Sequence, residues 1–329
     1  MVITSIYTPR KTLIESLSLG WSVVVVGDEK SPHGEWSRIK LENFHYLDPE
    51  KQKKLFPEFS VLMGFGTYTR KNIGYLFAIQ NGAKVIWDTD DDTLIRENAK
   101  SNFQNLAGCE FYEVNSGGYF NPYKFFTNQK SLWPRGYPLR RIANERVVTT
   151  EELGIVRSLQ APKFDILQTL VNLEPDLDAI YRMTVGDEVL NFECDSRILI
   201  LNGTTVSPGN TQSTLWVNPD KFKFLYVPRW VSFRFCDILK MYIAQRYSQL
   251  AYAGFWSEQD RNHHDYLVDF ESEVECYLKT ELVVEYLQGS EVSSLCGVYK
   301  GLYEEGLCRE EEIQAAALFE ELVERYQSE

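Results

Sequence analysis

The segment KVIWDTDDDTL, Lys84 to Leu94, places four aspartates within five positions directly after an apolar run. The apolar run predicts a buried strand, and the preceding segment, 67–82, carries apolar residues at helical spacing. A second apolar run, WSVVVVGD at 21–28, follows another predicted helix at 9–20. Strands that alternate with helices are typical of a mostly parallel α/β sheet covered on both faces. We therefore place the aspartates at the carboxyl end of a central strand, the sheet edge where ligands bind.

The rest of the chain divides into an irregular middle and a helical end. Segment 102–172 is rich in aromatic residues, Pro and Gly, which predicts long ordered loops with short elements, typical of a site lid or substrate wall. A strand is expected at 177–185, and the helices predicted after it are 236–253, 272–289 and 309–327.

Two of these helices carry a row of apolar residues. In 272–289 the row is Val274, Leu278, Leu282 and Tyr286. In 309–327 it is Ile313, Leu318, Leu322 and Tyr326. The second row predicts a packing face or an oligomer contact, and its acidic polar side argues against a membrane helix.

The composition is that of a folded, acidic protein. Asp and Glu number 47 against 34 Lys and Arg, which gives a formal net charge of −13. A negative long-range field repels phosphate backbones and anionic lipids, so we expect neither nucleic acid nor a membrane surface as a partner. The six cysteines include no C-x-x-C pair, which predicts reduced thiols and no zinc site.

The start of the sequence, MVITSIYTPRK, lacks the charged leader and apolar run of a signal peptide. No stretch approaches the roughly 20 apolar residues of a membrane span. We therefore expect a cytoplasmic protein.

Clustered aspartates at a sheet edge suit a divalent cation. Alternate residues of an extended segment point the same way, so Asp88, Asp90 and Asp92 are expected to converge. Carboxylates without His or Cys neighbours select Mg²⁺ or Mn²⁺, which complete their shells with phosphate oxygens. Neither glycine-rich nucleotide motif is present, so a nucleotide would be held by the metal and by strand-end groups. The alternative is a water-exposed acidic turn.

Five stretches, taken in order, resemble the STELLO-like glycosyltransferases. They are GWSVVVVGDEKSP, TYTRKNIGYLFAIQNGAKVIWDTDDDT, EPDLDAIYRMT, VSFRFCDILKMYIAQRY and GFWSEQD, and the resemblance runs from about Lys11 to Leu287. It implies a GT-A fold in which a D-x-D motif and Mn²⁺ or Mg²⁺ hold a nucleoside-diphosphate sugar. The implied division is a transferase domain at 1–290, with a nucleotide-sugar half at 1–100 and an acceptor half at 101–290. A helical extension at 291–329 lies outside the resemblance. Plant members are anchored in the Golgi membrane, and no comparable apolar segment is found here.

The resemblance implies residues for the donor side. Asp88-Thr89-Asp90 matches D-x-D, whose first acid lies near ribose and metal and whose last binds the metal. Asp91 and Asp92 extend the motif, and either is a candidate for the extra ligand. Arg70 and Lys71 would face the nucleotide from a helix N-terminus, where anions are favoured. Their alternative is a solvated first turn.

Further candidates come from strand ends and polar clusters. Thr4, Tyr7 and Asp28 match the place where GT-A enzymes seat the base, although Tyr7 is equally a candidate core aromatic. Arg261 and His264 are candidates for contact with the diphosphate. The acceptor candidates are Asn210 and Gln212, which would bond sugar hydroxyls, and Trp133 and Arg135, which would wall the saccharide. The alternatives are loop capping and packing.

Asp237 is the candidate general base. An inverting transferase needs an acid that takes the proton of the acceptor hydroxyl, on the side of the sugar away from the metal. Asp237 matches the acid that opens the acceptor-side helix in GT-A enzymes. Its alternative is a helix N-cap. Glu258 and Asp260 are the reserve candidates.

Three functions are consistent with these residues. The first is a metal-dependent, inverting glycosyltransferase that uses a UDP-sugar and a saccharide or glycan acceptor. The second is a UDP-sugar mutase, which would interconvert the donor without an acceptor. The third is a non-catalytic partner in a polysaccharide-synthesising complex, against which the intact aspartate cluster argues.

Overall fold

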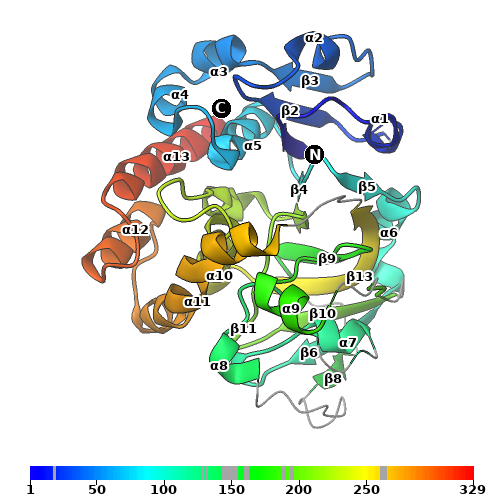
Figure 1. Ribbon diagram of the computed structural model, residues 1–329, viewed down its shortest axis with the longest axis vertical. Coiled ribbons are helices and arrows are strands. Elements are labelled where there is room, and N and C mark those ends of the chain that lie inside the picture. Colours follow the sequence, from blue (N-terminus) through cyan, green and yellow to red (C-terminus); the bar gives the residue numbers. More distant parts are fainter. Residues whose placement is uncertain are drawn as a thin grey trace.

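The computed structural model describes residues 1–17, 20–127, 129, 132–142, 155–158, 163–186, 190–192, 196–259 and 265–329. Within these ranges the chain forms one 11-stranded mixed sheet with helices on both faces, and a separate two-stranded sheet (Figure 1). The predicted α/β class is confirmed. The prediction of a mostly parallel sheet holds for the N-terminal strands, whereas the whole sheet mixes parallel and antiparallel pairs.

The N-terminal half supplies four parallel strands in the spatial order β3-β2-β1-β4. Its elements are β1 (Val2–Ser5), α1 (Lys11–Leu17), β2 (Val23–Gly27), α2 (His33–Trp36), β3 (Phe44–Leu47), α3 (Pro49–Leu55), α4 (Pro57–Met63), η1 (Tyr68–Arg70), α5 (Lys71–Gln80) and β4 (Ile86–Thr89). The chain moves outward from β1 to β3 and then crosses back to place β4 on the other side of β1. This reversal opens a crevice at the carboxyl ends of β1 and β4.

Helix α5 lies close against the sheet at Gly74. A Cβ atom at that position would lie 2.5 Å from Val2 Cγ1 and 2.8 Å from Val26 Cγ2, so a larger residue does not fit. The close approach brings Lys71, at the start of α5, within 2.7 Å of Asp88 on β4.

Beyond β4 the sheet continues in the order β12-β9-β13-β10-β6-β8, and β5 pairs with β13. The strands and small elements of this part are β5 (Thr93–Ile95), α6 (Ala99–Gln104), η2 (Leu106–Gly108), β6 (Glu110–Val114), β7 (Gly118–Tyr119), α7 (Tyr123–Phe126), α8 (Leu139–Ile142), β8 (Ile155–Ser158), β9 (Ile166–Asn172), α9 (Ala179–Thr184), β10 (Arg197–Leu201), β11 (Thr205–Val206), β12 (Ser213–Trp216), η3 (Pro219–Leu225) and β13 (Leu250–Gln259). The predicted loops of 102–172 thus contain three strands of the main sheet.

Two predicted elements are wrong. Segment 177–185 was expected to be a strand, but it forms α9, because the Asp178 carboxylate caps a helix by accepting from the Tyr181 amide at 2.7 Å. The predicted helix 236–253 ends at Tyr247 in α10 (Cys236–Tyr247), and β13 begins at Leu250. β13 lies between β9 and β10, so pairing on both sides makes the apolar run a strand.

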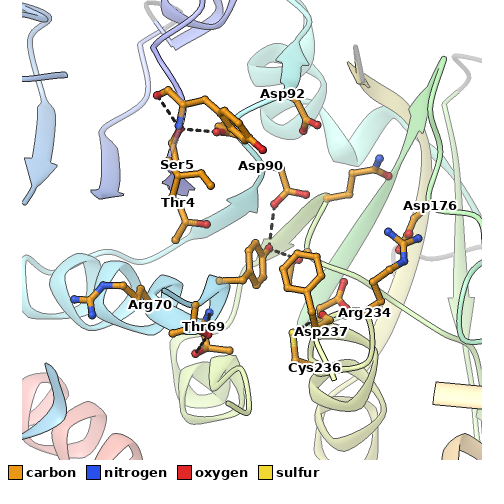
Figure 2. A pocket seen from close by; sticks show the side chains of 18 of the residues that line it. Thr4, Ser5, Thr69, Arg70, Asp90, Asp92, Asp176, Arg234, Cys236 and Asp237 are labelled. Atoms are coloured by element: carbon orange, nitrogen blue, oxygen red, sulfur yellow. Dashed lines mark hydrogen bonds between the residues drawn. The ribbon is translucent and has the colours of Figure 1, made fainter. Parts of the chain in front are cut away.

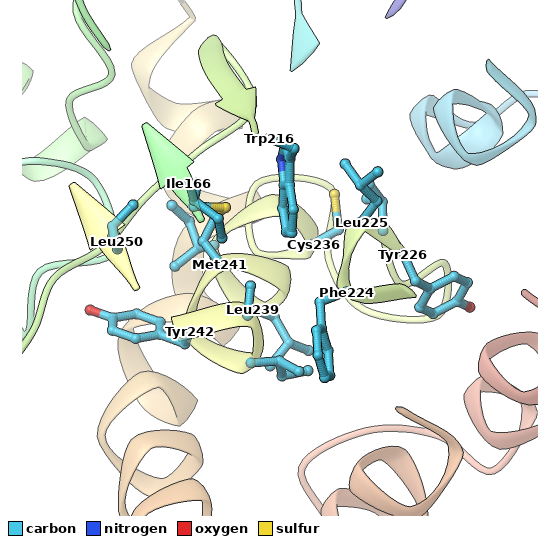
Figure 3. Close-up of a cluster of buried hydrophobic side chains, with 14 of the residues drawn as sticks. Ile166, Trp216, Phe224, Leu225, Tyr226, Cys236, Leu239, Met241, Tyr242 and Leu250 are labelled. Carbon is cyan, nitrogen blue, oxygen red and sulfur yellow. The ribbon is translucent and has the colours of Figure 1, made fainter. Parts of the chain in front are cut away.

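Helix α10 covers one face of the mixed part of the sheet. Leu239, Met241 and Tyr242 of α10 are buried against Ile166, Trp216 and Leu250 of the strands, and η3 closes the cluster from the side (Figure 3). Burial of this kind fixes the axis of α10, and with it the position of its first turn, which faces the crevice.

The last helices are α11 (Tyr266–Gly289), α12 (Leu295–Glu304) and α13 (Glu311–Ser328). α13 packs against α4 and α5 of the N-terminal half, and Phe319 meets Phe59 at a ring-centroid distance of 5.9 Å. Figure 1 shows the chain ending beside α5. The packing interpretation for 309–327 is confirmed, because Leu322 is buried and Ile313, Leu318 and Tyr326 are partly buried against the core. An oligomer contact through this helix stays a prediction. No helix of the described ranges is long and apolar enough to cross a membrane.

A buried carboxyl on α13 should make stability depend on pH. Burial raises the pKa of Glu312 from 4.5 to about 7, and its carboxyl accepts from the Tyr226 hydroxyl and the Trp230 amide. The folded protein therefore keeps a proton that the unfolded chain releases, and stability falls as pH rises towards 7. Relative to Glu312→Gln, the unfolding free energy of the parent should fall by about 2–3 kcal/mol between about pH 5 and about pH 8. Urea titrations of both proteins would measure this, and parallel pH curves would contradict it.

Candidate functional site

A cavity of about 880 Å³ lies at the carboxyl ends of β1, β2 and β4 (Figure 2). Asp90, Asp91 and Asp92 lie on its strand side, as the predicted place of the cluster requires. The first turn of α10 and the segment around Asp176 form the opposite wall. The cavity therefore joins the N-terminal strands to the second half of the chain.

The four aspartates do not converge. Asp88 is fully buried, Asp90 and Asp92 line the cavity, and Asp91 accepts from the Ser5 hydroxyl at 2.5 Å. Burial raises the pKa of Asp91 to about 6, partly opposed by the Ser5 hydrogen bond. In the described part of the chain, no three His, Cys, Asp or Glu side chains come together to form a ready cation site.

Asp88 lies beneath the cavity floor and is held by three side chains. Lys71 Nζ lies 2.7 Å from Oδ1, Lys240 Nζ lies 2.7 Å from Oδ2, and the Tyr75 hydroxyl donates to Oδ2 at 2.5 Å. Burial lowers the pKa of Lys240, whereas for Lys71 the attraction of Asp88 and Asp90 outweighs burial and raises the pKa. Asp88 thus balances buried charge and orients Lys71.

Asp90 lies directly above this network. Its Oδ1 accepts from Lys71 Nζ at 3.0 Å and from the Tyr68 hydroxyl at 3.0 Å, and 20% of its side chain is exposed (Figure 2). Asp92 Oδ1 accepts from Gln259 Nε2 at 2.6 Å. Because Mg²⁺ and Mn²⁺ typically use one or two protein carboxylates and complete the shell with ligand oxygens, Asp90 and Asp92 fit such a cation. The buried, doubly paired Asp88 does not fit it.

The donor-side candidates surround the other end of the cavity. Thr4 and Tyr7 line it, and Tyr7 is 67% exposed, so the alternative of a core aromatic is wrong. Asp28 accepts from the Gly66 amide at 2.8 Å and so holds the backbone that leads into η1. Its carboxylate therefore shapes the cavity wall.

Arg70 and Lys71 are not a solvated first turn, because both side chains are buried. The Arg70 guanidinium donates to Gly64 O and Gln52 Oε1 and lies 3.8 Å from the centre of the Phe65 ring. Burial lowers the pKa of Arg70 to about 10. Arg70 lines the cavity. Lys71 does not line it, but its ammonium group holds the carboxylate of Asp90, which does.

On the opposite wall, Asp237 is bound by Arg135. Arg135 Nη1 lies 3.1 Å from Oδ1 and Nη2 lies 2.8 Å from Oδ2, and the same guanidinium meets Asp176 at 2.7 and 2.9 Å. The two carboxylates raise the pKa of Arg135 despite its burial. The N-cap position of α10 is Phe235 and no side chain caps it, so the capping alternative for Asp237 is wrong.

Only some of the acceptor candidates line the cavity. Gln212 lines the cavity and donates to Glu174 O at 2.7 Å. Trp133 lies behind the wall, where its indole N–H donates to Asp178 at 2.6 Å, and Asn210 bonds to Gln168 at 2.9 Å. The reserve Glu258 pairs with Arg96 away from the cavity. Arg261, His264 and Asp260 lie outside the described residues.

Several lining residues were not found by the sequence reasoning. They are Asp176, Arg182, Arg229, Phe233 and Arg234. Phe233 is exposed and meets the Tyr68 ring edge-on at 5.6 Å. Phe233 and Arg234 belong to the stretch VSFRFCD, and Asp176 and Arg182 belong to EPDLDAIYRMT. The resemblance covers both stretches, and this was the signal that could have found the four residues.

The fold and the cavity define an α/β protein with a cavity lined by acidic and basic side chains at the switch point of its sheet. Two Arabidopsis thaliana proteins are similar in sequence, "Probable glycosyltransferase STELLO1" over 245 residues and "Probable glycosyltransferase STELLO2" over 244, each at 29% identity. Each match covers 69% of this chain, and the chain spans only 30% of each relative. No protein-family model matches the chain. The distant similarity to probable glycosyltransferases confirms the resemblance seen in the sequence.

Proposed function

We propose that the protein transfers a sugar from a nucleoside-diphosphate sugar, with a UDP-sugar as donor, to a hydroxyl of a saccharide or glycan acceptor. The observation that carries the proposal is one cavity with Asp90 and Asp92 on one wall and Asp237 on the other. Inversion needs this separation, because the leaving diphosphate and the acceptor proton are handled on opposite sides of the sugar. The similarity to probable glycosyltransferases supports the same function.

The donor would lie against the ends of β1, β2 and β4. Thr4 and Tyr7 would contact the base and ribose, and Asp90 and Asp92 would hold Mg²⁺ or Mn²⁺ with the diphosphate oxygens. A bound cation would neutralise charge on the departing diphosphate. Lys71, held by Asp88, keeps the Asp90 carboxylate in place. Contact of Arg261 and His264 with the diphosphate stays a prediction.

The acceptor would enter beside α10, near Gln212 and Asp237. Arg135 binds both Asp237 oxygens and so fixes the carboxylate, while each oxygen keeps a lone pair for a substrate hydroxyl. As the acceptor oxygen forms its bond to the anomeric carbon, Asp237 takes the hydroxyl proton. The bond between that carbon and the diphosphate oxygen breaks, and the diphosphate leaves with the electron pair.

A panel of UDP-sugars, each incubated with and without Mn²⁺, tests the proposal. A transferase should slowly hydrolyse one donor in the absence of an acceptor, because water replaces the acceptor hydroxyl. Conversion of the donor into an isomer would instead indicate a mutase. Absence of both donor binding and donor turnover across the panel would leave the non-catalytic partner as the function.

Asp90→Ala should abolish the Mn²⁺-dependent rise in melting temperature that UDP produces, because it removes the one cavity carboxylate held by Lys71. The melting temperature of the ligand-free protein should change little, because Lys71 keeps Asp88 as a partner. Differential scanning fluorimetry with UDP, with and without Mn²⁺, measures both effects. Unchanged UDP stabilisation in Mn²⁺ would show that Asp90 holds no metal.

A further inference from the structure

The side chain of Phe233 is an exposed aromatic ring inside the cavity. Phe233 lines the cavity, and 62% of the residue is exposed. Two further large hydrophobic side chains of the cavity wall are exposed, Ile6 and Tyr7, and both follow β1 on the strand side. Phe233 lies on the opposite wall, in the segment that leads into α10. An exposed ring in a cavity rich in charged side chains is a surface for a ligand that has an apolar face.

The backbone that carries this ring is held in place. Ser232 O accepts from the Cys236 amide at 3.1 Å, and Cys236 Sγ donates to Phe233 O at 3.1 Å. The next residue, Arg234, donates through its Nε to the buried carboxylate of Glu273 in α11. The exposure of the ring is therefore built into a fixed turn. A ligand that packs on the ring does not have to order the backbone first, which favours binding.

Phe233 lies between the two groups that the proposed function uses. Its ring meets the Tyr68 ring edge-on at a centroid distance of 5.6 Å, and the Tyr68 hydroxyl donates to Asp90 Oδ1 at 3.0 Å. In the other direction, Asp237 follows four residues later in the first turn of α10. The anomeric carbon of a donor would lie between the diphosphate at Asp90 and the base at Asp237. The sugar ring would therefore lie beside Phe233.

The chemistry of a sugar ring suits such a side chain. A sugar ring presents C–H groups on its faces and hydroxyl groups around its rim. Contact between one of these faces and the Phe233 ring removes apolar surface from water on both sides and gains dispersion energy. The negative face of the aromatic ring also attracts the slightly positive hydrogens of the C–H groups. The hydroxyl groups stay free to form hydrogen bonds with polar side chains of the cavity.

We propose that Phe233 is the surface on which the sugar ring of the donor stacks, so that the anomeric carbon is held between the diphosphate and Asp237. This inference rests on the proposed function and extends it to the sugar itself. Thr4, Tyr7, Asp90 and Asp92 would hold the nucleotide and its cation, whereas Phe233 would hold the group that is transferred. Its removal should therefore weaken the binding of a UDP-sugar and not that of UDP.

The test compares two variants by calorimetry in Mn²⁺, with UDP and with the UDP-sugar of the panel that the parent binds most tightly. Phe233→Ala removes the ring and should bind the UDP-sugar about tenfold more weakly, equivalent to about 1.4 kcal/mol, with unchanged UDP affinity. Phe233→Tyr keeps the ring and should bind both ligands like the parent. Phe270→Ala is the matched control, because Phe270 is an exposed phenylalanine of α11 outside the residues that line the cavity.

Two further measurements do not depend on these affinities. The melting temperature of Phe233→Ala should stay close to that of the parent, because the ring is already exposed. A large fall would assign the ring to the packing of the wall and overturn the proposal. In the parent, saturation of the aromatic protons should transfer to the sugar C–H protons of the bound UDP-sugar in an NMR experiment. Transfer confined to the uracil and ribose protons would also overturn it.

The outcomes separate this proposal from the proposed function. Equal affinity of Phe233→Ala and the parent for the UDP-sugar would overturn the stacking role and leave sugar transfer intact. An equal loss of UDP and UDP-sugar affinity would overturn it as well, because Phe233 would then act on the nucleotide, either directly or through Tyr68 and Asp90. Absence of UDP-sugar binding by the parent across the panel would overturn the proposed function, and the stacking role with it.

Discussion

Asp237→Asn is expected to lower kcat by on the order of 10²–10⁴ while donor binding is retained. The amide keeps the size of the carboxylate but cannot accept the acceptor proton at this position. Arg135 lies 3.1 Å from Asp237 Oδ1 and 2.8 Å from Oδ2, so the amide nitrogen of Asn faces a guanidinium donor in either of its two orientations. The asparagine oxygen keeps one hydrogen bond from Arg135, and the second guanidinium nitrogen loses its acceptor on this residue.

Steady-state kinetics with donor and acceptor would measure kcat, and calorimetry would measure the UDP affinity that should stay unchanged. A purely structural Asp237 would change the UDP affinity along with kcat. Arg135→Lys is the matched control for positioning, because it keeps a positive charge but loses the bidentate contact with both Asp237 and Asp176. It should lower kcat less than Asp237→Asn. Near-normal turnover by the Asn variant would remove Asp237 as the base, and a retained anomeric configuration would remove inversion.

Asp88→Ala should lower the unfolding free energy by about 3–5 kcal/mol, because it leaves buried lysine charge uncompensated. Lys240 loses its ion-pair partner at 2.7 Å, and Tyr75 loses its acceptor at 2.5 Å. Urea unfolding at neutral pH measures the loss. The loss should shrink as pH rises towards about 10, because a buried, unpaired lysine gives up its proton and the folded state then carries no isolated charge.

Two variants test whether the stability loss comes from the uncompensated lysine charge or from the space that the smaller alanine side chain leaves. Asp90→Ala makes the same chemical change two residues later, and it should cost much less stability because Lys71 keeps Asp88 at 2.7 Å. Asp88→Leu combined with Lys240→Met removes the acid and its lysine together, and it should recover most of the loss. Failure of the double variant to recover would show that packing around Asp88, and not its charge, supports the fold.

The sequence alone predicted β2, α5 and β4 of the N-terminal half and the sheet edge at which the cavity lies, whereas α2, β3, α3 and α4 were not predicted. The unbroken apolar run of β2 and the helical spacing before β4 are local patterns, and both elements form where the patterns lie. A parallel arrangement then placed the aspartates after β4 at the cavity, because strand ends of one direction meet at one sheet edge. The resemblance through VSFRFCD likewise brought Asp237 to the same site.

Only the tertiary structure decided what each side chain does. The alternation of side chains along an extended segment predicted that Asp88 and Asp90 point the same way. Instead, Asp88 is a buried charge beneath the cavity floor, paired with Lys240, which lies 152 residues further along the chain. Arg135, from a loop distant in sequence, binds the Asp237 carboxylate, which therefore does not cap α10. Pairing with β9 and β10 makes β13 a strand where the local pattern read as helix. Each outcome depends on a partner remote in sequence, and buried charges and strand pairs take their energy from such partners and not from their neighbours along the chain.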